Sequence, residues 1–313
     1  MSARSPVLFL VFNRPDTTQR VFDAIRAARP PRLYVAADGT RPERLGEAAR
    51  CAAVRSIATA VDWPCEVVTL MRDENLGCKR AVSSAIAWFF EHEPEGIILE
   101  DDCLPDPSFF PYCDELLERY RNDPKVMCVS GNNFISSTWV PQASYYFSKY
   151  VHIWGWASWR RAWQYYDVGM RDWENVRDTL DPLMRRLPDQ PQARLHWREL
   201  FDRVSKGQID TWDYQWTYAC WRHDGLSCMP QINLISNIGF GEGATHTVSP
   251  ESKLANLSVG SIATPLQHPE TVESDAEADR WTSEHVFEIN EQRSVLSRWR
   301  RALGRTLRQA GFR

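Results

Sequence analysis

The sequence lacks a long apolar segment near its start. The first apolar run, in MSARSPVLFLVFNRPD, ends within about seven residues and has no small-residue cleavage site. A secretory leader or a membrane-spanning helix needs a longer run, so we interpret this segment as a first buried strand. The sequence therefore predicts a soluble, cytoplasmic protein.

The sequence also lacks closely spaced cysteines. None of its eight cysteines stands in a CxxC pair, which argues against a structural zinc site. Without a secretion signal we expect these cysteines to be reduced thiols.

Net charge is small as well, because 37 Lys and Arg oppose 41 Asp and Glu and leave −4. The protein therefore has no overall basic surface potential, and nucleic acid is not an expected partner.

Tryptophan, in contrast, is abundant: ten of the 14 tryptophans lie between Trp139 and Trp221. A length of 313 residues allows one large core or two modest domains.

Short runs rich in Val, Ile and Leu alternate with helical patterns in the first 131 residues. Asp16 can cap a helix with Val21 and Ile25 on one side, and residues 78–90 carry apolar positions at helical spacing. This alternation predicts an α/β fold, with a mostly parallel sheet covered by helices. Ligands of such sheets bind at the carboxyl ends of the strands. The expected strands are 6–12, 32–38, 65–70, 96–100 and 125–131.

Three acidic residues, Glu100, Asp101 and Asp102, follow the expected strand 96–100. Successive carboxylates repel one another unless a positive charge is near, and Mg²⁺ or Mn²⁺ would supply it while also neutralising a diphosphate. The alternative is a solvated acidic turn. The position at the end of a buried strand favours a metal and ligand site.

The segment Arg72 to Arg80 leads into the next expected helix. Lys79 and Arg80 stand in its first turn, where the helix dipole disfavours cations, and a bound phosphate would resolve this conflict. The alternative is that Asn75 caps the helix and the cations reach solvent.

Two later segments carry further candidates. Asp213, beside Trp212 and Trp216, is a candidate general base, although Asp210 or Thr211 could simply cap a helix whose first turn contains Asp213. The glycine-rich loop 237–247 could fold over a phosphate. There, His246 is a candidate metal ligand, with a structural histidine as the alternative. The flat faces of Trp156, Trp159 and Trp163 could stack on sugar rings or pack in the core.

The order of short motifs resembles a known family over residues 6–247. These are NRP, ADG, NLGCKRAV, EDDCLPDPSFF, GWASWRRAW, WDYQW and SNIGFGEGATHT. The order resembles bacterial nucleotide-diphospho-sugar transferases of the GT-A fold, similar to glycosyltransferase family 2 and including proteins labelled haemolysin-like. The EDD triplet is similar to that of eukaryotic N-acetylglucosaminyltransferases. The chain departs from the DxD and ED motifs that are common in the family: its acidic triplet is EDD, and the residue before Asp213 is Trp212 and not an acid.

The resemblance implies a hexosyl- or N-acetylhexosaminyltransferase that uses a divalent metal and a nucleotide-diphosphate sugar, with a UDP-sugar favoured. It implies Asp102 as the main metal ligand, His246 as a later metal or phosphate contact, and Asp213 as the base of an inverting displacement. The acceptor would be a glycan, a lipid-linked sugar or a glycoprotein, as in surface polysaccharide assembly. The implied donor-binding residues are Phe12, Arg14, Asp38, Gly39, Arg72, Asn75, Gly77, Lys79, Glu100 and Asp101.

The expected organisation has four parts: a nucleotide-sugar half (1–131), an acceptor half of the same domain (132–247), a polar linker (248–285) and a basic amphipathic helix (286–313). Seven arginines surround apolar positions at three- and four-residue intervals in 289–313. This pattern suggests peripheral contact with the inner face of a membrane. The alternative is docking on its own domain or on another subunit.

Two other functions compete with sugar transfer. A sugar nucleotidyltransferase also uses an α/β sheet and magnesium, but usually has a glycine-rich, arginine-containing loop after its first strand, where this chain has Asn13-Arg14-Pro15. A catalytically inactive carbohydrate-binding scaffold would bind sugars without metal dependence or turnover.

Overall fold

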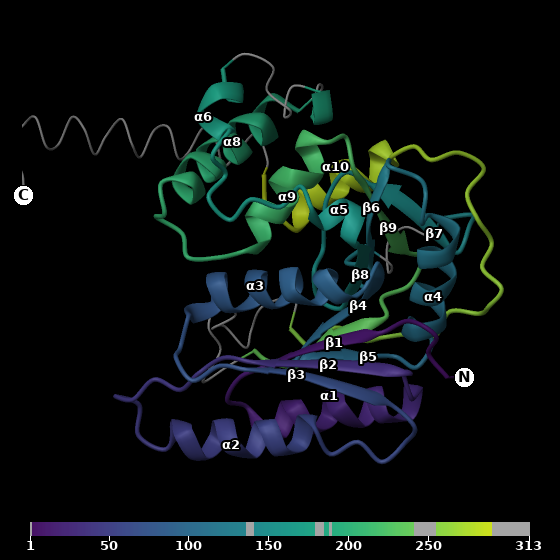
Figure 1. Ribbon diagram of the computed structural model, residues 1–313. Coiled ribbons are helices and arrows are strands. Elements are labelled where there is room, and N and C mark those ends of the chain that lie inside the picture. Colours follow the sequence, from purple (N-terminus) through teal and green to yellow (C-terminus); the bar gives the residue numbers. More distant parts are fainter. Residues whose placement is uncertain (1, 136–140, 179–184, 188–189, 241–254, 290–313) are drawn as a thin grey trace, which may run out of the picture.

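The structure, a computed structural model (Figure 1), describes residues 2–135, 141–178, 185–187, 190–240 and 255–289. The predicted metal ligand His246, Gly241 and Gly243 of the glycine-rich loop, and residues 290–313 of the predicted basic helix lie outside the described residues. No helix in the described ranges is long and apolar enough to cross a membrane.

The described residues form an eight-stranded sheet with the order β3-β2-β1-β4-β8-β6-β9-β7. Strands β3, β2, β1 and β4 are parallel; β8 is antiparallel to both of its neighbours, β9 is parallel to β6, and β7 is antiparallel to β9. The strands are β1 (Val7–Val11), β2 (Arg32–Ala37), β3 (Glu66–Met71), β4 (Glu95–Glu100), β6 (Val126–Ser130), β7 (Tyr145–Ser148), β8 (Trp156–Trp159) and β9 (Leu226–Pro230). A small second sheet pairs β5 (Cys103–Pro105) with β10 (Ile235–Asn237).

Helices cover both faces of the sheet. In Figure 1, α1 and α2 lie below it and α3 above it. One core joins the sheet to α1, α2 and α4, and another joins it to α3, α5, α8 and α9. The helices are α1 (Pro15–Ala28), α2 (Glu47–Ala58), α3 (Gly77–His92), α4 (Phe109–Arg119), α5 (Arg160–Trp163), α6 (Trp173–Val176), α8 (Pro191–Ser205), α9 (Asp213–Arg222) and α10 (Ala276–His285). The predicted α/β class with a mostly parallel sheet is confirmed.

One detail of the first helix differs from the prediction. Helix α1 begins at Pro15, and Arg14 is its N-terminal flanking residue, so Asp16 lies inside the first turn and is not the cap. The fixed φ of proline suits the first helical position, where the missing N–H has no partner to lose. The acidic Asp16 still interacts favourably with the helix dipole.

Three tryptophans that were candidates for sugar stacking lie in the core. Trp156, Trp159 and Trp163 are 0%, 1% and 5% exposed, so their faces are not free to stack on a ligand. The Trp156 ring stacks on Trp212 at 5.9 Å, and Trp163 packs against Trp216 at 5.1 Å. For these three residues the core alternative is correct.

Part of the segment expected as a linker packs against the sheet. Asp279 of α10 is fully buried, and its carboxylate accepts hydrogen bonds from the Ser148 hydroxyl (2.6 Å) and the Lys149 amide (3.2 Å) at the end of β7. The first turn of α10 is capped by Asp275, which accepts from the Ala278 amide. Apolar residues of α10, including the buried Ala278, pack on Tyr146 and Met229.

Replacing Asp279 by asparagine is expected to make stability less dependent on pH. Burial is the main cause that raises the pKa of Asp279 to about 7, against the opposing effect of the Ser148 hydrogen bond and the Lys149 charge and with a smaller contribution from Asp275. Since the unfolded carboxyl ionises near its ordinary value, the native state loses stability as pH rises from about 4 to about 7. The variant should therefore be more stable than the original at about pH 8, on the order of 3 kcal/mol, and similar at about pH 4.

Urea unfolding of both proteins at the two pH values measures this difference. Glu277→Gln, an exposed change in the same helix, is the control and should shift stability little at either pH. An Asp279→Asn effect of equal size at both pH values would show that the charge is not responsible.

Candidate functional site

The site lies where the order of the parallel strands reverses. The chain runs outward from β1 through β2 to β3, and then returns to the other side of β1 with β4. Such a reversal leaves a crevice at the carboxyl ends of the two central strands. A cavity of about 540 Å³ occupies this position. Its lining comes from the ends of β1, β2 and β4, the residues after β2 and β3, and the start of α3.

The cavity has an apolar interior and a charged mouth. Leu10 and Ala36 of the sheet face Ala81, Val82 and Ala85 of α3 across the interior. The mouth carries arginines and carboxylates: Arg14, Arg41, Arg44, Arg72, Asp38, Glu100 and Asp101.

Most of the implied donor-binding residues are brought together here. Gly39 and Lys79 do not line the cavity. A Cβ at Gly39 would overlap the backbone of Glu74, so this glycine is required for close packing of two strand-end loops. The implied residues that do line the cavity are Phe12, Arg14, Asp38, Arg72, Asn75, Gly77, Glu100 and Asp101.

Asp38 caps α3 from a neighbouring strand. Its carboxylate accepts hydrogen bonds from the amides of Leu76 (3.0 Å) and Gly77 (3.1 Å). Asn75 is not the cap, because its side-chain amide donates to the Gly39 carbonyl (2.8 Å). Two amides expected to receive a phosphate therefore already have an anionic partner, supplied by a residue distant in sequence.

Arg14 bridges two carboxylates of the acidic triplet. Its guanidinium pairs with Asp101 and, at 2.9 Å, with Asp102. The Phe12 amide donates to the other Asp101 oxygen (3.2 Å). Burial lowers the pKa of Arg14, but the Asp101 and Asp102 charges outweigh it and raise that pKa above its usual value. The side chains of Asp101 and Asp102 are 3% and 11% exposed, so this pairing is shielded from water.

The triplet carries more negative charge than Arg14 balances. Burial is the main cause that raises the pKa of Glu100 to about 8, and the Asp102 and Asp101 charges add to it. Burial likewise raises the pKa of Asp101 to about 6, although Arg14 opposes this. Within the described ranges no hydrogen bond or ion pair involves the Glu100 carboxylate, which faces the cavity.

The triplet is the predicted site of a divalent metal. The described residues hold no group of three or more His, Cys, Asp or Glu side chains arranged as a metal site. Mg²⁺ is commonly held by one or two carboxylates together with substrate phosphates and water. In the triplet, Arg14 pairs with Asp101 and Asp102, and within the described ranges only the Glu100 carboxylate has no partner.

The residues after β10 pack against the triplet. The Ile238 amide donates to the Asp102 carbonyl (2.8 Å), and the Gly239 amide donates to the Asn237 side chain (2.9 Å). A Cβ at Gly239 would overlap the Asp102 carboxylate and the Arg14 guanidinium. Glycine is therefore needed at position 239, the first glycine of the glycine-rich loop.

Asp213 lies in the first turn of α9, as predicted, and is half-buried, but the residue before the helix is Trp212, so neither Asp210 nor Thr211 is its cap. The Thr211 hydroxyl donates to its carboxylate. Asp213 does not line the cavity, but it is close to it: burial raises the pKa of the Cys78 thiol to about 12, and the charges of Glu100 and Asp213 add to this effect. Asp210, three residues earlier, approaches within 3.9 Å of the position of a Cβ on Gly77.

Sequence reasoning missed two arginines, Arg41 and Arg44, in the loop between β2 and α2. Arg41 lies over the Phe12 ring (5.2 Å to its centre) and pairs with the buried Glu47, which also accepts from the Asn13 amide (2.9 Å). The Arg41 hydrogen bond is the main cause that lowers the pKa of Glu47 to about 2. Arg44 lines the cavity beside them. The rule that polar residues after a strand end line the ligand crevice could have found both arginines.

No protein-family model matches the chain, and neither does any curated protein. Among solved structures, the chain is similar to apo UDP-glucose pyrophosphorylase (11% identity, TM-score 0.25), covering 46% of this chain and 63% of that one. It is similar to CMP:2-keto-3-deoxy-manno-octonic acid synthetase complexed with CTP (15%, 0.30), covering 64% and 87%. It is also similar to apo mouse xyloside xylosyltransferase 1 (10%, 0.33), covering 72% and 84%.

Proposed function

We propose that this protein is a glycosyltransferase that moves a sugar from a nucleotide diphosphate to a carbohydrate acceptor. One observation carries the proposal: a cavity at the strand reversal combines an apolar slot, an arginine-rich mouth and an adjoining acidic triplet. A nucleotide sugar has the matching parts, namely a flat base, an anionic diphosphate and a polar sugar. The motif order resembling GT-A transferases supports the same conclusion.

The donor would enter with its base between the sheet and α3. Leu10, Ala36 and Ala81 offer an apolar slot of the kind that small-molecule sites use for flat groups. The arginines at the mouth, with Arg44 exposed and Arg72 at the end of β3, suit a diphosphate, because guanidinium groups bind phosphate oxygens in pairs. The transferred sugar would then lie next to the acidic triplet.

Asp102, with Asp101, would hold a divalent metal such as manganese. When bound, the metal supplies Lewis-acid stabilisation of the leaving nucleoside diphosphate. Arg14 fixes both carboxylates through its two guanidinium nitrogens and so orients them. Asp213 would remove the proton from the acceptor hydroxyl.

Isothermal titration of UDP, GDP, dTDP and CDP, each with manganese or with chelator, tests the proposal. We expect one nucleotide, UDP in the first instance, to bind with manganese and to bind at least about tenfold more weakly with chelator. Asp102→Ala should remove most of the metal dependence, because it deletes the proposed main ligand. The matched control is Asp106→Ala, at an acid outside the cavity lining and beyond the triplet. Absence of binding by all four nucleotides would overturn the assignment.

A further inference from the structure

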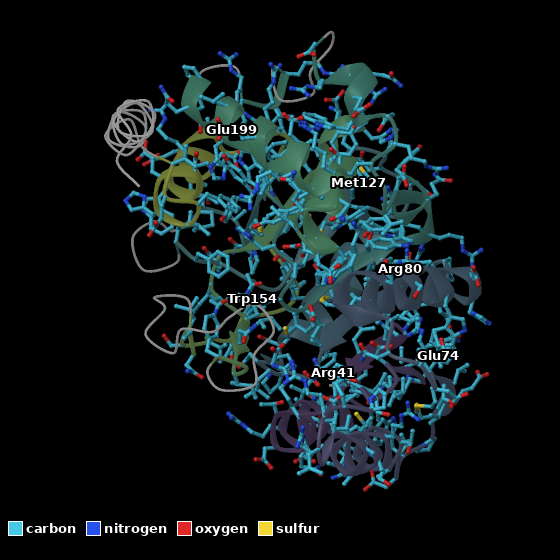
Figure 2. The ribbon with its side chains drawn as sticks, turned by 90° about the vertical axis from the view of Figure 1, so that its left-hand side faces the viewer. Arg41, Glu74, Arg80, Met127, Trp154 and Glu199 are labelled. Carbon is cyan, nitrogen blue, oxygen red and sulfur yellow. The ribbon has the colours of Figure 1, made fainter. Side chains whose placement is uncertain are left out.

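Three aromatic side chains gather outside the cavity lining, near the acidic triplet. The Trp154 ring packs edge-to-face against Phe134 at 5.5 Å and against Phe240 at 5.8 Å. All three are half-buried, unlike the fully packed Trp156 and Trp159. None of the three lines the cavity. Figure 2 shows Trp154 on the side of the molecule away from Arg80, which marks α3.

Trp154 lies two residues before β8, near the end of β4. Ile98 of β4 pairs with Trp156, the first residue of β8, and Gly155 before it has a left-handed backbone (φ 60°), so the paired strands end there. A Cβ on Gly155 would lie 3.3 Å from the side chain of Leu99, the neighbour of Glu100. Trp154 therefore stands at the same sheet edge as the triplet.

Phe240 approaches the same place from β10. It follows Gly239, where a Cβ would overlap the Asp102 carboxylate. Phe134 comes from the end of β6, four residues beyond Ser130, which pairs with Trp156. Three separate elements thus bring aromatic rings to one position next to Asp102.

A buried amide without partners lies at this edge as well. Asn132 is 0% exposed, and its side-chain oxygen and nitrogen have no hydrogen-bond partner among the described residues. The Gly131 amide, just before Asn132, donates to the Gly155 carbonyl, just after Trp154 (2.8 Å), so the two segments are adjacent at this edge. An unpaired buried amide is costly, and a hydroxyl group can both donate to it and accept from it.

We propose that Trp154, Phe134 and Phe240 form the acceptor subsite and stack on the apolar face of a sugar ring. The inference rests on the proposed function, because the acceptor of a transferred sugar has to reach the triplet from the side opposite the nucleotide. Aromatic rings with one free face bind the C–H face of a pyranose while its hydroxyls meet polar groups at the rim.

The test is saturation-transfer NMR with a panel of probes, namely the methyl glycosides of glucose, galactose, mannose, N-acetylglucosamine and rhamnose, in the presence of UDP and manganese. We expect at least one glycoside to bind the wild type and to bind about tenfold more weakly to Trp154→Ala. Trp154→Phe should retain most of the binding. Tyr165→Ala, at an exposed aromatic residue stacked on His223, is the matched control and should bind as the wild type does.

Titration of UDP separates this inference from the proposed function. Trp154→Ala should bind UDP as tightly as the wild type, which also shows that the variant is folded; if its UDP binding is lost, Phe240→Ala takes its place in the comparison. UDP binding with no glycoside bound by the wild type, or with equal glycoside binding by the alanine variants, would overturn the subsite. Failure of the wild type to bind any nucleotide would overturn the proposed function itself.

Discussion

Asp213→Asn is expected to lower turnover by about 10²–10⁴-fold while leaving donor affinity nearly unchanged. Asparagine keeps the shape of the side chain and can still accept from the Thr211 hydroxyl, but it does not take a proton from an acceptor. Asp213 lies outside the cavity lining, so its loss should not disturb the nucleotide. Steady-state rates of nucleotide release, together with UDP titration, measure both quantities.

Asp210→Asn is the matched control, because Asp210 precedes α9 by three residues and is exposed. Its turnover should remain close to that of the wild type. An equal loss of turnover in the two variants would show that the negative charge of this segment matters, and that Asp213 is not a general base. If Asp213 is the base of a single displacement, proton NMR of the first-formed product should show an inverted anomeric configuration, and a retained one would contradict the mechanism.

Arg14→Ala is expected to destabilise the fold by about 2–3 kcal/mol in the presence of chelator. The change leaves Asp101 and Asp102 largely buried without the cation that they share. Because the Arg14 side chain is 27% exposed, we expect a smaller loss of unfolding free energy than for a fully buried ion pair. Manganese should restore part of this stability, since the freed carboxylates would then bind the metal. Urea unfolding with manganese and with chelator measures both effects.

Arg44→Ala provides the comparison, because Arg44 lines the same cavity but is exposed. Its unfolding free energy should change by no more than about 0.5 kcal/mol. An Arg14→Ala variant as stable as the wild type in chelator would show that the triplet does not depend on this guanidinium. Stabilisation of neither the wild type nor the variant by manganese would argue against a metal at these carboxylates.

The sequence alone predicts the strands that consist of continuous apolar residues. β1, β2, β4 and β6 lie within the expected segments or within one residue of them, because their apolar residues face cores on both sides of the sheet. The strand-end rule then brought Arg14, Asp38 and Glu100 to one crevice. Local pattern and sheet geometry are sufficient for this part of the site.

Contacts between residues far apart in the chain could not be predicted from the sequence. The carboxylate of Asp38 caps a helix that begins 39 residues later, and Arg14 pairs with acids 87 and 88 residues away. The spacing of motifs says nothing about which tryptophan keeps a free face. Burial decides this, and it separates Trp154 from Trp156 two residues later.

Strand β8 lies between β4 and β6 in space, although it follows both in the chain. During synthesis, residues 95–130 therefore leave the ribosome with two facing strand edges unpaired until residues 156–159 arrive to fill the gap. Open strand edges can pair with other chains, so we expect the nascent chain to be prone to aggregation in this interval. Because β6 also pairs with β9, a shortened chain intended for expression has to extend at least through residue 230.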